Sequence, residues 1–498
     1  MSGSAYNSMQ KNRGNAESWL YRMVIREKLN NPFGYAVITA CTILISVAIS
    51  MEGMQSAVLL AAVVIGLPLV FGALFNLQFG IAMTLVASFF VLWFKKFLPG
   101  NYPLGLLIDI LIGVMFFGMF IKQIAVRDWS FLKNPVSLFV LMWIVYNILM
   151  FANPSAQSRE AWFYTVRGMA FFIVLYYIAV YAFNSMRALE TVIYLFVTLS
   201  LLAALYGLYQ EFVGLPGIEM KWLHSDPRLY KLVYQWGKIR VFSFLSDPST
   251  FGILMSYMGI FCMALAIGPF SPRKKAFFFI SGMLMLMAMI FSGTRTAFVL
   301  VPAAFVFFAI LTLKRWVIFS LVVFMLFFSV LMMVPTGNST LYRFQSAFKP
   351  NKDASMNTRL TNQRNIQPFI WSHPIGGGLG STGYFGKRFN PGSMLAEFPP
   401  DSGFVRVAVE LGWIGLFLYC TLLFVVLRTG ITNYVSSRND KIRTYYVAFL
   451  LMIFAMVLSN YPQDSLVQLP TSIIFYLSLA ALVRLKDFDK AAAQHLKK

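Results

Sequence analysis

The sequence predicts an all-α polytopic integral membrane protein with about fourteen (twelve to fourteen) transmembrane helices and one large, partly helical extracytoplasmic loop. Hydrophobic residues make up 58% of the 498 positions and charged residues only 12%, whereas soluble domains are about 45–50% apolar and about 25% charged. The apolar residues form runs of about 20, long enough to cross a ~30 Å hydrocarbon core. Outer-membrane barrels use strands of ~10 alternating residues instead. Composition therefore excludes a soluble enzyme, and the run lengths exclude a barrel.

The elements follow in order from a polar tail at residues 1–30, which has no cleavable signal peptide and is predicted to be cytoplasmic. The N-terminal group of spans occupies 31–212, the central group 248–334 and the C-terminal group 403–483, before a second cytoplasmic tail at 484–498. Fourteen spans are predicted near 33–51, 56–75, 79–95, 104–121, 135–152, 168–184, 189–212, 248–269, 275–292, 297–313, 316–334, 403–427, 443–459 and 467–483.

Loop charges predict the orientation of these spans. With the N-terminus inside, cytoplasmic segments hold 23 of the 41 lysines and arginines, and the short outer loops and span ends hold six. This asymmetry agrees with the positive-inside rule, and an even number of spans puts both termini in the cytoplasm. Lys95 and Lys96, at the outer end of a span, are the local exception.

Two long polar segments, 213–247 and 335–402, hold the remaining twelve basic residues. Loops longer than ~12–15 residues are usually functional or disordered. Both segments are predicted to lie outside and both are net basic, so they favour an anionic, membrane-borne ligand such as a lipid diphosphate. The structural alternative is that basic loops contact anionic headgroups.

The segment 335–402 is too patterned for disorder. Residues 358–371 place apolar side chains among polar ones, which predicts an amphipathic helix at the membrane surface. The chain then breaks at His373-Pro374 and enters the glycine-rich turn 376–380. We expect the backbone N–H groups of this turn to approach a ligand closely.

Two arginines are candidate phosphate ligands, because a planar guanidinium binds phosphate oxygens in pairs. Arg295 lies in the short turn Ser292-Gly293-Thr294-Arg295 between two spans, at a depth where a cation is costly. Arg240 precedes Ser246-Asp247-Pro248, which predicts a helix start and an anion-favouring helix N-terminus. For each arginine, the alternative is an interfacial side chain that extends to the headgroups.

These residues together resemble a known family. Asp401-Ser402, followed after nine residues by Gly412-Trp413-Ile414-Gly415, is similar to the signature of the O-antigen ligase and O-antigen polymerase superfamily. Three further features follow the family's order: Arg240 with Ser-Asp-Pro-Ser, the turn at Arg295, and Arg359 followed by His373-Pro374 and the glycine-rich turn. The resemblance covers residues of about 235–420.

The resemblance implies transfer of a glycan from undecaprenyl diphosphate to a glycan or lipid A-core acceptor, on the periplasmic face of a bacterial inner membrane. It implies an enzyme that works without metal or other cofactor and without a nucleic acid partner, in contact with membrane lipids. Arg240 and Arg295 would neutralise the diphosphate, and Asp401 would contact the acceptor hydroxyl. Direct displacement by that hydroxyl would invert the configuration of the anomeric carbon. Further substrate contacts are expected from Arg359, Arg364, Lys238, Thr294, Ser402 and His373.

Asp401 stands where the family's ligases have histidine. A carboxylate also accepts a proton from a sugar hydroxyl, so the exchange favours a repeat-unit polymerase slightly over a lipid A-core ligase. Three alternatives stay open. For Asp401, the alternative is that it only caps the next helix. For Arg359 and Arg364, the alternative is that they face lipid headgroups. For the protein as a whole, the alternative is a flippase for lipid-linked oligosaccharides. Arg406 and Glu410, four residues apart in a predicted helix, are expected to pair.

Overall fold

The computed structural model describes residues 32–52, 66–96, 104–127, 129–235, 237–335, 337, 339–346, 348 and 354–495. These residues are largely helical, and their contacts divide the chain into two units, residues 1–72 and 73–498. The first unit contains α2 (Pro32–Glu52) and the start of a short apolar helix, Gly66–Phe75. The predicted N-terminal tail and the first half of the predicted span 56–75 lie outside the described residues.

Among the described residues, eleven helices are long and apolar enough to cross a membrane, so the multi-pass, all-α class is confirmed while the number fourteen is not. They are α4 (Leu77–Lys95), α5 (Leu106–Val126), α6 (Pro135–Leu149) with η3 (Met150–Ala152), α7–η4–α8 (Arg159–Val166, Arg167–Phe171, Val174–Ala182), α9 (Met186–Phe212), α12 (Pro248–Ala266), α13 (Pro272–Ser292), α14 (Arg295–Thr312), α15 (Arg315–Met333), α20 (Gly403–Ser436) and α21 (Asp440–Ser459). The predicted last span corresponds to α22 (Thr471–His495), which continues through much of the predicted C-terminal tail.

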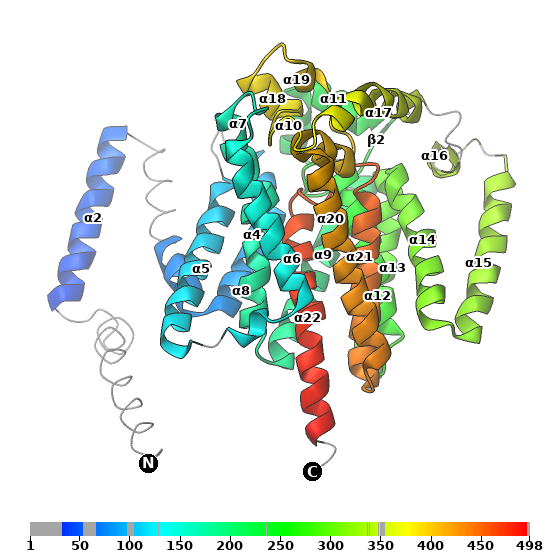
Figure 1. Cartoon of the computed structure of the whole chain (residues 1–498), viewed down its shortest axis with the longest axis horizontal. Coiled ribbons are helices and arrows are strands. Elements are labelled where there is room, and N and C mark those ends of the chain that lie inside the picture. The colour runs from blue at the N-terminus through cyan, green and yellow to red at the C-terminus, as the bar shows by residue number, and fades with distance from the viewer. Residues whose placement is uncertain are drawn as a thin grey trace. The chain divides into compact units, whose positions relative to one another are not determined.

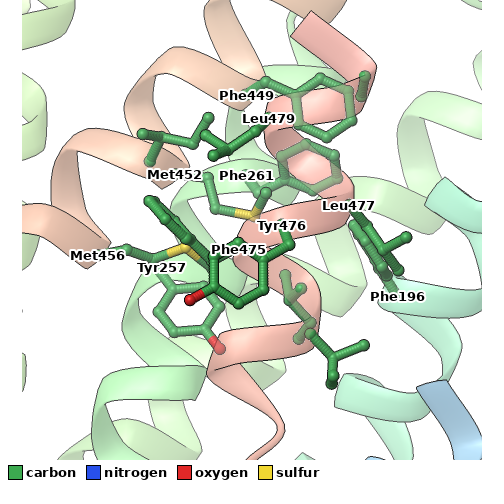
Figure 2. Packing of buried hydrophobic residues seen from close by; sticks show 14 of the residues in the cluster. Phe196, Tyr257, Phe261, Phe449, Met452, Met456, Phe475, Tyr476, Leu477 and Leu479 are labelled. Atoms are coloured by element: carbon green, nitrogen blue, oxygen red, sulfur yellow. The ribbon is translucent and has the colours of Figure 1, made fainter. Parts of the chain in front are cut away.

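The core of the second unit is built around α12. Its span is 83% buried, whereas that of α15 is 6% buried. Figure 2 shows aromatic side chains from α9, α12, α21 and α22 meeting in this core. The rings of Phe261 and Phe449 have centroids 5.1 Å apart, and the hydroxyls of Tyr257 and Thr471 form a hydrogen bond of 3.1 Å.

The two long polar segments are folded and lie at the same end of the second unit, which we call the loop end (Figure 1). The first contains α10 (Gly217–His224), α11 (Pro227–Val233) and an antiparallel pair of two-residue strands, β1 (Tyr234–Gln235) and β2 (Lys238–Ile239). The second contains α16 (Ser339–Ser346), α17 (Ala354–Ser372), α18 (Gly383–Phe389) and α19 (Met394–Glu397). In the connection between α5 and α6 there is one short 3₁₀ turn, η2 (Ser130–Leu132).

Buried polar contacts hold the first segment against α4 and α9. Glu219 is 1% exposed and accepts hydrogen bonds from Trp93 (3.1 Å) and Gln210 (2.8 Å). The ammonium of Lys96 donates to the carbonyl of Leu245 (2.8 Å). Burial lowers the pKa of Lys96 to about 8, although the nearby carboxylates of Glu219 and Asp247 favour its charged form. Lys96, an exception to the predicted charge asymmetry, is therefore enclosed by the basic segment itself.

The second segment is held in place by a break in α20. At Gly412 the backbone leaves the helical region (φ 72°, ψ 179°), so the carbonyls of the preceding turn lose their intrahelical donors. Gly377 N–H donates to the carbonyl of Val409 and Gly378 N–H to that of Glu410, both at 2.9 Å. The hydroxyl of Tyr146 donates to the carbonyl of Leu411 (2.7 Å).

On the other side of the break, Ile414 N–H donates to the carbonyl of Pro374 at 3.2 Å. The glycine-rich turn thus supplies partners to α20 in place of the missing helical bonds. Unpaired backbone groups are costly away from water, which explains why this turn and Gly412 occur together. A Cβ on Gly412 would overlap the Pro374 carbonyl.

We expect Gly412→Ala to destabilise the protein by at least about 3 kcal/mol, because it combines an unfavourable backbone conformation with a collision against the 374–376 backbone. The apparent melting temperature in detergent measures this effect. Gly392→Ala is the matched control, since Gly392 also has a positive φ (84°) but open space around it. It should cost only about 1–2 kcal/mol, and equal losses in the two variants would contradict the packing argument.

Candidate functional site

The candidate site begins with the turn between α13 and α14. Gly293 ends α13 in the left-handed conformation (φ 56°), Thr294 is the N-cap residue of α14, and Arg295 is the first residue of that helix. Thr294 is buried, and its hydroxyl donates to the carbonyl of Pro248 at the start of α12 (2.9 Å). The half-buried Arg295 is therefore held at the loop end by a turn fixed to a neighbouring helix.

Arg240 contacts this turn and is 7% exposed. Its guanidinium donates to the carbonyl of Ser292 (2.9 Å), to the hydroxyl of Thr294 (3.1 Å) and to the carbonyl of Leu232 (3.3 Å). The sequence predicted Arg240 as a direct phosphate ligand. The geometry gives it a second role, since it ties the segment 213–247 to the turn that carries Arg295.

The helix start predicted at Ser246-Asp247-Pro248 is confirmed, with Pro248 in the first turn of α12. Its N-terminus is not open to an external anion, however. One oxygen of the Asp247 carboxylate accepts the backbone N–H groups of Ser249 (2.8 Å) and Thr250 (3.0 Å). The chain supplies its own anion here, so this helix end is corrected from a ligand site to a capped start.

Arg359 of α17 lies near two of the three predicted catalytic residues, Arg295 and Asp401. It lies near enough to Arg295 for their like charges to repel each other, and its Nε is 3.8 Å from a carboxylate oxygen of Asp401. The Arg359 side chain is 30% exposed and that of Asp401 is 46% exposed. Arg295, Arg359 and Asp401 form what we call the loop-end cluster, a partly solvated group of two cations and one carboxylate from three separate parts of the chain.

Asp401 does not cap α20, contrary to the structural alternative from the sequence. Ser402 is the N-cap residue, and its hydroxyl accepts the N–H of Val405 (3.4 Å). Ser402 is 3% exposed, so its predicted contact with substrate is replaced by a helix-capping role. Asp401 precedes the helix, with its carboxylate toward Arg359.

The glycine-rich turn also differs from the expectation. Residues 376–380 are buried, and the N–H of Gly380 donates to the carboxylate of Glu410 (3.0 Å). Because Gly377, Gly378 and Gly380 all donate to α20, the turn is a packing element rather than a loop whose N–H groups face a ligand.

The predicted pair of Arg406 and Glu410 is confirmed (Nε to Oε1, 3.2 Å) and belongs to a larger buried network. Arg406 also binds Asp464, from the loop after α21. Glu410 is fully buried and accepts the Thr382 hydroxyl at 2.5 Å as well as the Gly380 N–H. Sequence analysis missed Asp464 and Thr382, because neither lies at helical spacing from its partner.

The other predicted substrate contacts lie outside the loop-end cluster. Lys238 in β2 and Arg364 in α17 are exposed. The ring of His373 stacks on Phe369 (centroids 4.0 Å apart). Helix α17 itself confirms the helix predicted at 358–371, but Ile366 packs against Leu395 and Val409, so part of its apolar surface faces protein rather than the membrane surface.

An apolar groove starts one helical turn below Arg295. It has a volume of about 680 Å³ and lies among α13, α14, α15 and α16. All of its lining side chains are apolar, and they include Met287, Phe298, Pro302, Phe328 and Phe344. A cationic cluster above a purely apolar groove is a geometry suited to an amphiphile with an anionic head.

The described part of the chain contains no group of three or more histidine, cysteine, aspartate or glutamate side chains arranged to hold a metal ion.

Comparison with known families supports the resemblance seen in the sequence. Residues 280–420 match the family model described as O-antigen ligase. This range contains all three residues of the loop-end cluster and the break at Gly412, while Arg240 and Lys238 precede it. Among curated proteins, no sequence matches the chain significantly.

We expect Arg240→Ala to lower stability by about 2–4 kcal/mol, because three hydrogen bonds of a buried guanidinium are lost. The apparent melting temperature in detergent measures the change, with the exposed Arg228→Ala as control, expected within about 0.5 kcal/mol of the wild type. An Arg240→Ala protein with normal stability and no glycan transfer would instead assign Arg240 to direct donor binding.

Proposed function

Because residues 280–420 match the O-antigen ligase family, we propose that this membrane protein is a glycosyltransferase that moves a glycan from undecaprenyl diphosphate to a sugar hydroxyl. The observation that carries the proposal is the loop-end cluster, in which Arg359 pairs with Asp401 and lies near enough to Arg295 for the two like charges to repel. We further propose that this end of the protein faces the periplasm from the inner membrane, with both termini in the cytoplasm.

The donor's diphosphate would bind between the two arginines. Repulsion between the two like charges raises the free energy of the empty site, and a bound dianion would relieve this repulsion. Guanidinium groups also bind phosphate oxygens in pairs. The same arginines would stabilise the negative charge that grows on the departing undecaprenyl diphosphate. In this proposal Arg240 fixes the turn that carries Arg295, and Thr294 holds that turn to α12.

The groove below Arg295 supports a polyprenyl donor over a soluble one. Its lining is entirely apolar, and one of its walls, α15, is 6% buried, so much of this helix is available to face lipid. A carrier lipid diffusing in the membrane would place its tail in the groove and its diphosphate beside Arg295. A soluble sugar nucleotide has no group that would fill such a groove.

Asp401 would accept the proton of the acceptor hydroxyl as that oxygen attacks the anomeric carbon. The new bond joins the acceptor oxygen to the anomeric carbon, and the bond from that carbon to the diphosphate oxygen breaks. Direct displacement inverts the anomeric configuration, and the proton remains on Asp401 until it is released to solvent. The 46% exposure of this side chain leaves room for an acceptor. No metal ion or other cofactor takes part in this scheme.

For the acceptor, we favour another lipid-linked repeat, which would make the protein a polymerase. The reason is the carboxylate at position 401, where the family's ligases carry histidine. Transfer to lipid A-core is the alternative within the same chemistry. A flippase is the alternative of another class, but the grouping of Arg295, Arg359 and Asp401 at one end, rather than along the middle of the spans, favours a transferase.

We expect Asp401→Asn to reduce turnover by about 10²–10⁴-fold, the usual contribution of a general base. Binding of the lipid donor should change far less, because the arginines remain. Turnover and donor binding are measured separately with purified protein and a lipid-linked repeat. Glu397→Gln is the matched control, since Glu397 is an exposed carboxylate paired with Lys387. Equal losses of binding and turnover in Asp401→Asn would refute the proton-transfer role.

The function itself is tested by the sizes of undecaprenyl-linked glycans and of surface polysaccharide in a deletion strain. We expect Arg295→Ala to be expressed but to leave glycan transfer abolished, and Arg228→Ala to restore it. Accumulated single repeats identify a polymerase, and long lipid-linked chains absent from lipid A-core identify a ligase. Repeats confined to the cytoplasmic leaflet identify a flippase, and normal glycan from Arg295→Ala rejects the assigned site.

A further inference from the structure

A second cavity lies at the end of the helices opposite the loop end. It has a volume of about 310 Å³, within the range of ~300–1,000 Å³ typical of small-molecule sites. It is lined by residues at the ends of α12 and α14, at the starts of α13, α15 and α21, and by Tyr434 of α20. None of these residues belongs to the loop-end cluster, the apolar groove or the buried network around Glu410.

Three cations from three helices line this cavity: Lys275 of α13, Lys314 beside the start of α15, and Arg443 of α21. One acidic residue, Asp440, accompanies them. Within the described part of the chain, none of the three cations forms an ion pair. The Arg443 guanidinium lies over the ring of Tyr434, 5.1 Å from its centroid, which fixes its direction. The cavity is therefore net positive, and its charges converge from segments far apart in the sequence.

Apart from Thr312 and Thr444, the side chains in the rest of the lining are apolar or aromatic. Ile267, Phe308 and Val447 form walls, and Trp316 is 49% exposed beside them. Tryptophan is enriched where a membrane meets water. The neighbouring helix α15 is almost entirely unburied along its span, so the cavity adjoins a surface that faces lipid. A soluble phosphate compound would use the cations but not these walls.

We propose that this cavity binds the phosphate group of an anionic membrane phospholipid. The two lysines and Arg443 would bind the phosphate oxygens, and the walls around Ile267 and Phe308 would contact the glycerol and the first carbons of the acyl chains. The inference does not depend on the proposed function, because it concerns the opposite end of the protein. Basic pockets between membrane helices commonly recognise anionic headgroups in this way.

The test is lipid binding by the full-length protein, freed of lipid in a neutral detergent and measured by native mass spectrometry. The probes are phosphatidylglycerol, phosphatidylcholine and soluble glycerol 3-phosphate. We expect phosphatidylglycerol to bind the wild type more tightly than either of the others. The double variant Lys275→Gln/Lys314→Gln should weaken phosphatidylglycerol binding at least ten-fold, since charge-assisted bonds to phosphate are among the strong ones. The milder Lys275→Gln alone should show part of the same loss.

The matched control is Arg273→Gln/Arg315→Gln. It removes the same charge from the same two helix starts, but neither arginine lines the cavity. We expect it to bind phosphatidylglycerol within about two-fold of the wild type, because the charge that is lost does not line the cavity and charges exposed to solvent are screened by salt. An equal loss of phosphatidylglycerol binding in the control would mean that general surface charge causes the effect, and it would overturn the proposed site. Equal binding of phosphatidylcholine, or binding of glycerol 3-phosphate as tight as that of phosphatidylglycerol, would also overturn it.

Discussion

The break in α20 at Gly412 is the constraint on which the loop end depends. A membrane helix that stops and restarts must find partners for its backbone groups from elsewhere in the protein, because lipid offers none. Here the partners are Gly377, Gly378, Pro374 and Tyr146. The exchange ties the second long segment to α20 at a defined register. These contacts thereby position two residues of the site. Asp401 lies just before α20, and Arg359 lies on α17, before the glycine-rich turn.

A second tier of buried charges reinforces this arrangement. Glu410 lies two residues before the break and is fully buried, and its carboxylate is satisfied by Arg406, Thr382 and Gly380. Arg406 extends the network to Asp464, so the loop before α20 and the loop after α21 share one set of polar contacts. A buried charge that lost one of these partners would be strongly destabilising. The network therefore favours a single arrangement of the site over a mobile one.

Much of the fold could be predicted from the sequence, because apolar run length and local spacing carry that information. The spans from α4 to α21, the start of α12 at Asp247-Pro248 and the pair of Arg406 and Glu410 all depend on neighbours within a few residues. The contacts that build the site do not. Asp464 is 58 residues from Arg406, and Arg240 is 54 from Thr294. The glycine-rich turn was wrongly interpreted as a ligand loop because glycine permits close approach to a helix backbone as readily as to a phosphate.

The lining of the apolar groove bears on selectivity. Methionine and phenylalanine side chains dominate it, and methionine in particular adapts its shape to what it contacts. None of the side chains that line the groove carries a polar group that could distinguish one hydrocarbon chain from another. A carrier lipid bound there would be accepted over a range of chain lengths and saturation patterns, so discrimination among substrates would fall to the sugar and diphosphate. The protein would then accept the carrier lipid of another organism more readily than it would accept a different glycan.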